Sequence, residues 1–307
     1  MNRRDFVKKF FQISGTILIS SFVNPVIILK KLIAEPASEL VSIKGENYEQ
    51  SLKLAIDLLG GIGKFIKKGD KVVIKPNIAW NRPVEMAANT NPEIVSAMIR
   101  LCREAKAGEI IVFDRTCTNP YKSYKISGIK KSAEEAGAKV VYVNKVSKKL
   151  YQKVKIHKGR YLKESLVCKY ILEADKVINI PVAKVHSSAV LTMALKNWMG
   201  TTGDRRGNWH FDLHNAIADY ASIMKPVLTV IDATRIMVKN GPAGGKLEYV
   251  KKKNMVIIST DQLLADVYAA KRLFNKTPRD IKYLGYAYKL GVGEINLSKA
   301  KIIEKTL

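Results

Sequence analysis

The chain has 307 residues, 47% of them hydrophobic, which is enough to bury the core of one large or two moderate domains. The formal net charge is +26, and removal of residues 1–34 still leaves +21, so the basic character belongs to the body of the chain. The cysteines Cys102, Cys117 and Cys168 are never spaced as Cys-x-x-Cys, which excludes an iron–sulfur cluster or a zinc ribbon built by this chain alone.

The N-terminal segment has the pattern of an export signal. Asn2-Arg3-Arg4-Asp5-Phe6-Val7-Lys8 is typical of the twin-arginine route, and a weakly apolar run from Phe10 to Leu29 follows. About 20 apolar residues can also cross a bilayer, and Ala34-x-x-Ala37 is not a clean cleavage site, so an uncleaved anchor is the alternative. We predict a signal peptide or anchor over residues 1–37, a single α/β domain over residues 38–307, and a location in the periplasm or on the outer face of the cytoplasmic membrane.

The first half of the body alternates between predicted helices and strands. Helices are expected over 48–66, 92–108 and 127–137, and strands over 71–75, 109–113 and 139–143. Asn91 is the predicted N-cap of the second helix, because Pro92 suits a first helical turn. The strands are short and continuously apolar, which is typical of a buried parallel sheet.

The second half continues the alternation after a basic segment, 145–163, with the character of a β-hairpin. We expect strands over 177–180, 227–232 and 255–260, a helix that ends at Gly200, helices that begin at Trp209 and Asp261, and a last short helix and loop over 283–293. The pattern predicts an α/β fold: a mostly parallel sheet with helices on both faces, built from right-handed βαβ units. Residues 70–76 resemble residues 175–181, which indicates either two similar halves or the ordinary recurrence of a strand that ends in proline.

Reactive side chains follow several of these strands. Parallel sheets bind ligands beyond the carboxyl ends of their strands, so we expect these side chains to meet in one crevice. They would offer carboxylates, a thiol, an amide, an imidazole and an ammonium group, which suits a metal site or an acid–base site. The residues are Asn77, Asp114 with Cys117, Lys184 with His186, and Asp232.

His210 and His214 are the most specific candidates for metal ligands in the sequence. On one helix, positions i and i+4 share a face with about 5–6 Å between Cβ atoms, a spacing that chelates Zn²⁺, Fe²⁺ or Ni²⁺. His186, Asp232 or Cys117 would complete the ligand set. The alternatives are acid–base or ligand contact, or histidines that only bond to loop carbonyls.

Further candidates follow the strand ends in the sequence. Lys196, next to Asn197 on a predicted helix, could hold an anionic substrate, act as a base, or be an ordinary solvated lysine. Arg205 and Arg206 suit a carboxylate or phosphate, unless they pair with nearby acidic residues. Cys117 is either a reactive thiol or a small buried residue.

A glycine-rich segment, Asn240-Gly241-Pro242-Ala243-Gly244-Gly245, could aim backbone N–H groups at an anion. Asn240, Gly241, Gly244 and Gly245 are the candidate contacts in that interpretation. The alternative is a tight structural turn, and the segment is not a nucleotide-binding loop of the G-x-x-x-x-G-K-S/T type.

The motifs above closely resemble those of the domain of unknown function 362 family over residues 40–293. Members of that family share no settled activity; some carry an attached ferredoxin-type module, and some have export signals. This chain has the signal motif and lacks the cluster cysteines, so the resemblance does not imply electron transfer through its own cluster. The matching segments are Ile74-Lys75-Pro76-Asn77, Asp114-Arg115-Thr116-Cys117, Lys184-Val185-His186, Ala194-Leu195-Lys196-Asn197-Trp198-Met199-Gly200, His210-Phe211-Asp212-Leu213-His214 with Ala218-Asp219, Ile231-Asp232-Ala233-Thr234, Asn240 to Gly245 and Ser259-Thr260-Asp261.

Three functions fit these features. The first is an enzyme of the cell envelope that binds a divalent metal or an anionic cofactor or substrate at the strand ends, with His186, Lys196, Asp232 and Cys117 as catalytic candidates and redox or isomerase chemistry. The second is a non-catalytic ligand- or metal-binding accessory of an exported redox complex. The third is a protein held at a membrane surface by its basic body and N-terminus. The positive net charge also fits the lysine-rich surface of a heat-adapted protein. The sequence has no basic motif with interleaved aromatic residues, so nucleic-acid binding is not expected.

Overall fold

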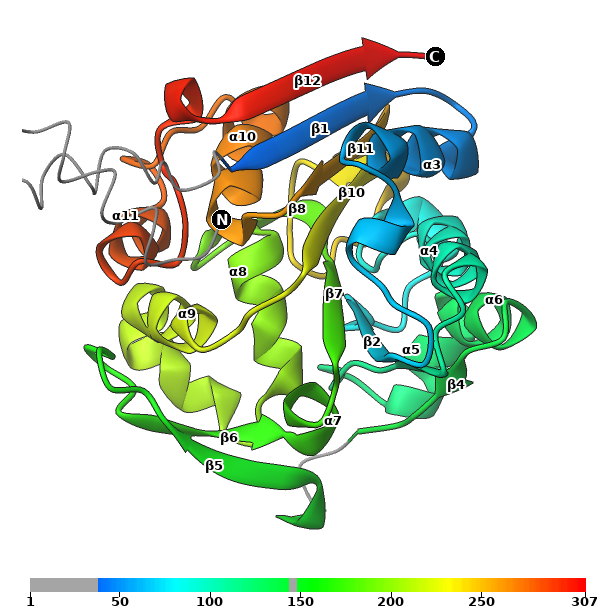
Figure 1. Ribbon diagram of the computed structural model, residues 1–307. Helices are drawn as coiled ribbons and strands as arrows, with labels where there is room; N and C mark the ends of the chain where they lie inside the picture. The colour runs from blue at the N-terminus through cyan, green and yellow to red at the C-terminus, as the bar shows by residue number, and fades with distance from the viewer. Residues whose placement is uncertain (1–37, 144–147) are drawn as a thin grey trace, which may run out of the picture. The chain divides into compact units, whose positions relative to one another are not determined.

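The computed structural model describes residues 38–143 and 148–307, and its central feature is a ten-stranded sheet (Figure 1). Eight strands follow the order β12-β1-β11-β10-β7-β2-β3-β4, while β8 pairs with β10 and β9 pairs with β8. The strands are β1 Glu39–Lys44, β2 Lys71–Pro76, β3 Glu109–Val112, β4 Lys139–Val140, β7 Lys176–Ile180, β8 Val182–His186, β9 Val190–Thr192, β10 Leu228–Met237, β11 Val250–Ser259 and β12 Lys301–Thr306.

Five adjacent strands, β10, β7, β2, β3 and β4, are parallel, so the predicted parallel α/β sheet is confirmed. From β2 the chain builds outward through β3 to β4, and it later returns to place β7 and β10 on the other side of β2. The direction of winding therefore reverses between β2 and β7. In doubly wound sheets such a switch point opens a crevice at the carboxyl ends of the strands.

The far side of the sheet is mixed. β11 runs antiparallel to both of its neighbours, β10 and β1, and β12 lies parallel to β1 at the edge. The strands β1 and β12 were not predicted. Each pairs with a segment distant in sequence, and such pairing leaves little local signal.

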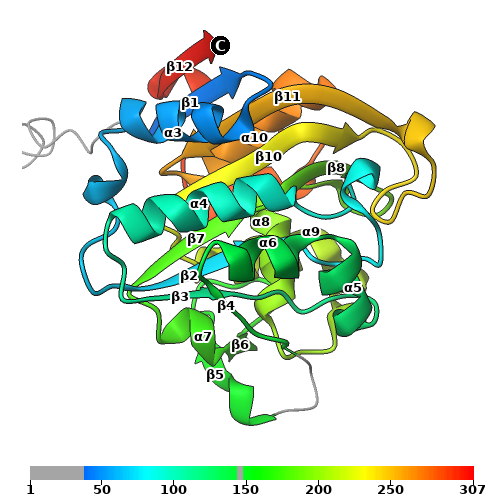
Figure 2. The same cartoon turned by 90° about the vertical axis from the view of Figure 1, so that its right-hand side faces the viewer.

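Helices cover both faces of the sheet (Figures 1 and 2), as predicted. Alternate residues of β2 explain the two layers, because Val72 and Ile74 pack into one core with α3, α4 and α6, whereas Val73 packs into the other with α8 to α11. The helices are α3 Tyr48–Leu58, α4 Pro92–Glu104, α5 Pro120–Ile126, α6 Ile129–Glu135, α7 Lys169–Leu172, α8 Ala194–Asn197, α9 Leu213–Ser222, α10 Gln262–Phe274 and α11 Lys282–Lys289.

Helix boundaries follow local chemistry. Asn91 caps α4 as predicted, since its Oδ1 accepts from the N–H of Glu93 at 3.0 Å. The helix predicted over 48–66 instead ends at Leu58, because Gly60 and Gly61 take φ values of 105° and 81°. The helix α5 was missed.

The basic segment forms a two-stranded antiparallel sheet, β5 Tyr151–Lys155 and β6 Glu164–Cys168, which confirms the hairpin. Asp219 of α9 holds its connection, accepting from the N–H groups of Arg160, Tyr161 and Leu162 at 2.6–2.8 Å. Among the described helices, none is both long and apolar enough to cross a membrane. The predicted twin-arginine signal or anchor, residues 1–37, lies outside the described residues.

Candidate functional site

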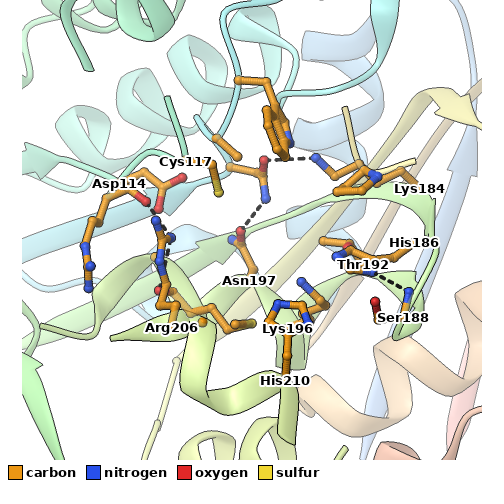
Figure 3. Close-up of a pocket in the computed structure, with 18 of the residues that line it drawn as sticks. Asp114, Cys117, Lys184, His186, Ser188, Thr192, Lys196, Asn197, Arg206 and His210 are labelled. Atoms are coloured by element: carbon orange, nitrogen blue, oxygen red, sulfur yellow. Dashed lines mark hydrogen bonds between the residues drawn. The ribbon is translucent and has the colours of Figure 1, made fainter. Parts of the chain in front are cut away.

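A cavity of about 830 Å³ opens at the switch point of the sheet (Figure 3). It lies beyond the carboxyl ends of β2 and β3 and beside β8, where the sequence predicted a crevice. The predicted residues that line it are Asn77, Asp114, Cys117, Lys184, His186, Lys196, Asn197, Arg205, Arg206 and His210.

The lining is strongly cationic. Five basic residues line it, Arg115, Lys184, Lys196, Arg205 and Arg206, and Asp114 carries the one carboxylate among the described lining residues. The three arginines are fully charged at pH 7, whereas Lys184, with a pKa of about 7, is only partly protonated. The Asp114 carboxylate is already paired, because the Nζ of Lys75 lies 2.7 Å from Asp114 Oδ1 and both side chains are buried. The cavity therefore presents an excess of positive charge in a partly desolvated place, where it attracts anions most strongly.

Two asparagines set the floor of the cavity. Asn77 donates through Nδ2 to Asn197 Oδ1 at 3.1 Å, and Asn197 donates through its own Nδ2 to the carbonyl of Lys75 at 3.1 Å and to Asn179 Oδ1 at 2.8 Å. Lys75 donates to the same Asn197 oxygen at 3.2 Å. These amides hold β2, β7 and α8 together, so their role here is to position the lysines.

Two lysines of the lining have unusual environments. Lys184 is fully buried and donates to Asn77 Oδ1 at 3.3 Å and to the carbonyl of Ala88, and burial lowers its pKa to about 7. Lys196 is half-buried, and burial, aided by the Arg206 cation, lowers its pKa to about 8. Within the described residues the Nζ of Lys196 makes no hydrogen bond or ion pair. Both groups can exchange protons near neutral pH.

His186 has a defined tautomer. Its Nδ1 accepts from the N–H groups of Ser188 and Ala189 at 3.1 and 3.2 Å, so the ring proton lies on Nε2. Burial and the nearby Lys196 and Lys184 cations lower its pKa to about 3, so the ring is neutral at pH 7. The Nε2–H of His186 is therefore a hydrogen-bond donor on an uncharged ring, and its catalytic role stays a prediction.

The arginines of the rim differ from one another. Arg206 donates to the carbonyls of Arg115 and Thr116 at 2.9 and 2.7 Å, which fixes its guanidinium at the cavity wall. Arg205 is exposed, and its side chain makes no hydrogen bond in the part of the chain that the structure describes. Neither pairs with an acidic residue there, so that alternative is wrong. Cys117 is exposed at the cavity, so the expectation of a buried cysteine is also wrong.

The predicted histidine pair does not form. Residues 206–212 are a 3₁₀ segment, and α9 begins only at Leu213, so His210 and His214 do not share one α-helical face. His210 lines the cavity, whereas His214 stacks on Tyr283 with ring centroids 6.0 Å apart and is absent from the lining. Within residues 38–143 and 148–307, no group of three or more His, Cys, Asp or Glu side chains could hold a metal ion.

Asp232 is structural rather than catalytic. β10 continues to Met237, so residue 232 lies inside a strand and not at its end. Its buried carboxylate accepts from the N–H of Asn91 at 2.7 Å and from Thr234 Oγ1 at 2.7 Å. Burial raises its pKa, but the group faces the start of α4 and not the cavity.

The segment 240–245 is a structural turn. Gly244 donates to the carbonyl of Asn240 at 3.1 Å, and a Cβ on Gly241 would lie 1.8 Å from the carbonyl oxygen of Val185. Only Pro242 of this segment lines the cavity. The predicted anion contacts by Asn240, Gly241, Gly244 and Gly245 are therefore wrong.

Sequence reasoning missed three residues of the site. Lys75 was given no role in the sequence analysis. A lysine inside an otherwise apolar, buried strand is unusual, and this could have marked it as a functional or paired residue. Asp266 of α10 is fully buried and accepts from the N–H groups of Ala194 and Leu195 at 2.6 and 3.1 Å, which anchors α8 and its Lys196; burial raises its pKa to about 7. Thr192 lines the cavity with a buried Oγ1 that has no partner among the described residues. No local pattern marks the last two.

A family model covers most of this chain. Residues 72–271 match the model described as Domain of unknown function (DUF362). Over 223 residues the chain is 29% identical to the thylakoid-associated protein sll1697 of Synechocystis sp.; the match covers 66% of this chain and 65% of that protein, so it spans less than two thirds of the relative.

Two solved structures are similar at a lower level. A crystal structure of a Thermotoga maritima protein has a TM-score of 0.48 at 13% identity, covering 74% of this chain and 59% of that one. The lactate racemase apoprotein of Thermoanaerobacterium thermosaccharolyticum has a TM-score of 0.37 at 12% identity, covering 68% and 54%. Similarity this low supports no statement about the chemistry of the cavity.

Proposed function

The chain belongs to the DUF362 family, and we propose that it binds a small organic anion, a carboxylate or a phosphate ester, in the cavity at the carboxyl ends of β2 and β3. One observation carries this proposal: five basic side chains line the cavity, three of them arginines, and the one carboxylate among the described lining residues is paired with Lys75. Leaving these cations close together without an anion costs electrostatic free energy, which a bound acid group would recover.

The ligand is held by groups whose bonding capacity is not used within the protein. Lys196 supplies an ammonium group, and Arg205 at the rim supplies a guanidinium fork that matches a carboxylate or phosphate. The Nε2–H of His186 donates to an uncharged oxygen of the ligand. This arrangement orients an acid group toward the rim and the rest of the molecule toward Lys196 and His186.

The chemistry that best suits this site is proton transfer of the isomerase type. Lys196, with a pKa of about 8, can accept a proton from carbon or oxygen and return it. His186 would stabilise negative charge on a ligand oxygen during such a step. A non-catalytic accessory that binds the same anion is the second candidate, favoured by the relative that is described only by its association with thylakoids.

Calorimetry with lactate and with inorganic phosphate tests the binding. Lys196→Met should weaken the affinity about tenfold or more, equivalent to about 1.4 kcal/mol. Lys289→Met, which removes an exposed lysine of α11, should leave it unchanged. Absence of binding by the wild-type protein, or equal affinities for the two variants, would contradict the proposal.

We place this activity outside the cytoplasm, since the Arg3-Arg4 motif is typical of a twin-arginine signal. Arg3→Lys/Arg4→Lys should keep the protein in the cytoplasmic fraction of its host, whereas wild type is recovered from the envelope. Equal distribution of the two proteins would overturn the location and leave the proposed binding untouched.

A further inference from the structure

Three lysines surround the cavity floor, and they differ in what their nitrogens bind. Lys75 contacts Asp114, the carbonyl of Pro76 and Asn197. Lys184 donates to Asn77 and to the carbonyl of Ala88. In the described residues the nitrogen of Lys196 has no such partner, so its lone pair and protons are available to a ligand.

Lys196 also lines the cavity and is half-buried. In Figure 3 it lies between Arg206 on one side and His186 and Thr192 on the other, next to His210. The buried carboxylate of Asp266 accepts hydrogen bonds from the backbone at the start of α8, which fixes the position of the helix that carries Lys196.

We infer that Lys196 is a carbonyl-reactive lysine, which forms an imine with a small aldehyde or ketone that bears a carboxylate or phosphate group. The inference deepens the proposed anion binding and rests on it. In the step, the neutral amine adds to the carbonyl carbon to form a carbinolamine, both N–H protons leave with the former carbonyl oxygen as water, and a C=N bond remains. No oxidant or reductant is consumed.

The groups around Lys196 match the needs of this step. The Nε2–H of His186 is available to bond the carbonyl oxygen as it gains negative charge. The acid group of the ligand would then face Arg205 and Arg206 at the rim.

The protonation state of Lys196 supports the same inference. An amine attacks a carbonyl only when it is neutral, and burial with the nearby Arg206 cation lowers the pKa of Lys196 to about 8. At pH 7 the neutral fraction of such a lysine is roughly 300-fold that of an ordinary exposed lysine.

Reductive trapping tests the inference. The full chain is incubated at pH 7 with pyruvate or dihydroxyacetone phosphate and sodium cyanoborohydride, which reduces an imine to a stable secondary amine. Butanone, of similar size to pyruvate but uncharged, is the matched probe. Peptide mass spectrometry should find the adduct at Lys196, formed about tenfold or more faster than at any exposed lysine and faster with the acidic probes than with butanone.

Two variants make the outcomes distinct. Lys196→Arg keeps the cation and should retain lactate binding by calorimetry while losing the adduct; Lys289→Arg should keep both. Lactate binding without preferential labelling of Lys196 in the wild-type chain overturns the imine and leaves the proposed function standing. Equal labelling by butanone and pyruvate overturns the acid-bearing ligand class. Wild-type protein that neither binds lactate nor labels at Lys196 overturns both proposals.

Discussion

The Nζ of Lys75 lies 2.7 Å from the Oδ1 of Asp114, and this buried ion pair joins the ends of β2 and β3 beneath the cavity. Asp114 is held from its other side, because its Oδ2 accepts from the N–H of Ile78 at 2.6 Å. A Cβ on Gly200 would lie 1.7 Å from Asp114 Oδ1, so the close approach of the 3₁₀ segment Trp198–Thr201, which follows α8, to this pair requires glycine. The cavity thus stands on a charged pair that is inaccessible to solvent.

Asp114→Asn should destabilise the protein by about 3 kcal/mol, since it leaves the Lys75 ammonium buried without its counter-charge. Urea unfolding measures the change. Glu134→Gln, which breaks an exposed pair with Lys130, is the control and should cost less than about 0.5 kcal/mol. If Asp114→Asn lowered the free energy of unfolding by no more than Glu134→Gln does, the Lys75–Asp114 pair would not contribute to stability as predicted.

Lys184 predicts a specific dependence of stability on pH. Its pKa is about 7 in the folded protein and 10.5 as an ordinary lysine, so between these values the unfolded chain binds the extra proton. The burial penalty of Lys184 is therefore fully present below pH 7 and fades as the pH rises toward 10.5. The free energy of unfolding of wild type minus that of Lys184→Met should rise by about 3 kcal/mol from pH 7 to 9.5. A flat difference would contradict the lowered pKa.

His186 should remain neutral, with its proton on Nε2, from pH 5 to pH 8. The two backbone N–H groups that bond Nδ1 disfavour the other tautomer, and burial with the Lys196 and Lys184 cations keeps the pKa near 3. Nitrogen-15 NMR of the imidazole distinguishes the tautomers directly. A proton on Nδ1 of the neutral ring would remove the donor role that both proposals give it, and titration of this ring near pH 6.5 would contradict the lowered pKa.

His214→Phe should leave anion affinity unchanged and alter the free energy of unfolding by less than about 1 kcal/mol. His214 stacks on Tyr283 away from the cavity, and its buried Nδ1 has no hydrogen-bond partner in the described part of the chain, so an apolar ring removes no polar contact there. Calorimetry with lactate and urea unfolding check the two expectations. A tenfold loss of lactate affinity in His214→Phe would contradict the conclusion that His214 lies outside the binding site.

Much of the fold was predictable because its signals are local. Continuous apolar runs located β2, β3 and β7, and an asparagine followed by proline located the start of α4. The general position of the site was predictable too, since polar residues after parallel strands converge at one edge of the sheet. For this reason Asn77, Asp114, Lys184 and His186 were found together from sequence.

Sequence therefore determined the alternating strands and helices of the parallel part of the sheet and the edge at which the reactive side chains gather, but not β1, β8, β9, β12, α5 or α7. Only the tertiary structure decided what each of those side chains does. Asp232 bonds the start of α4 because β10 continues past it, and His214 packs on α11 because a 3₁₀ turn separates it from His210. The lowered pKa of Lys196 comes from its burial and from the nearby Arg206 cation. These properties depend on neighbours far away in the chain, and desolvation and hydrogen-bond partners are set by such neighbours and not by local sequence.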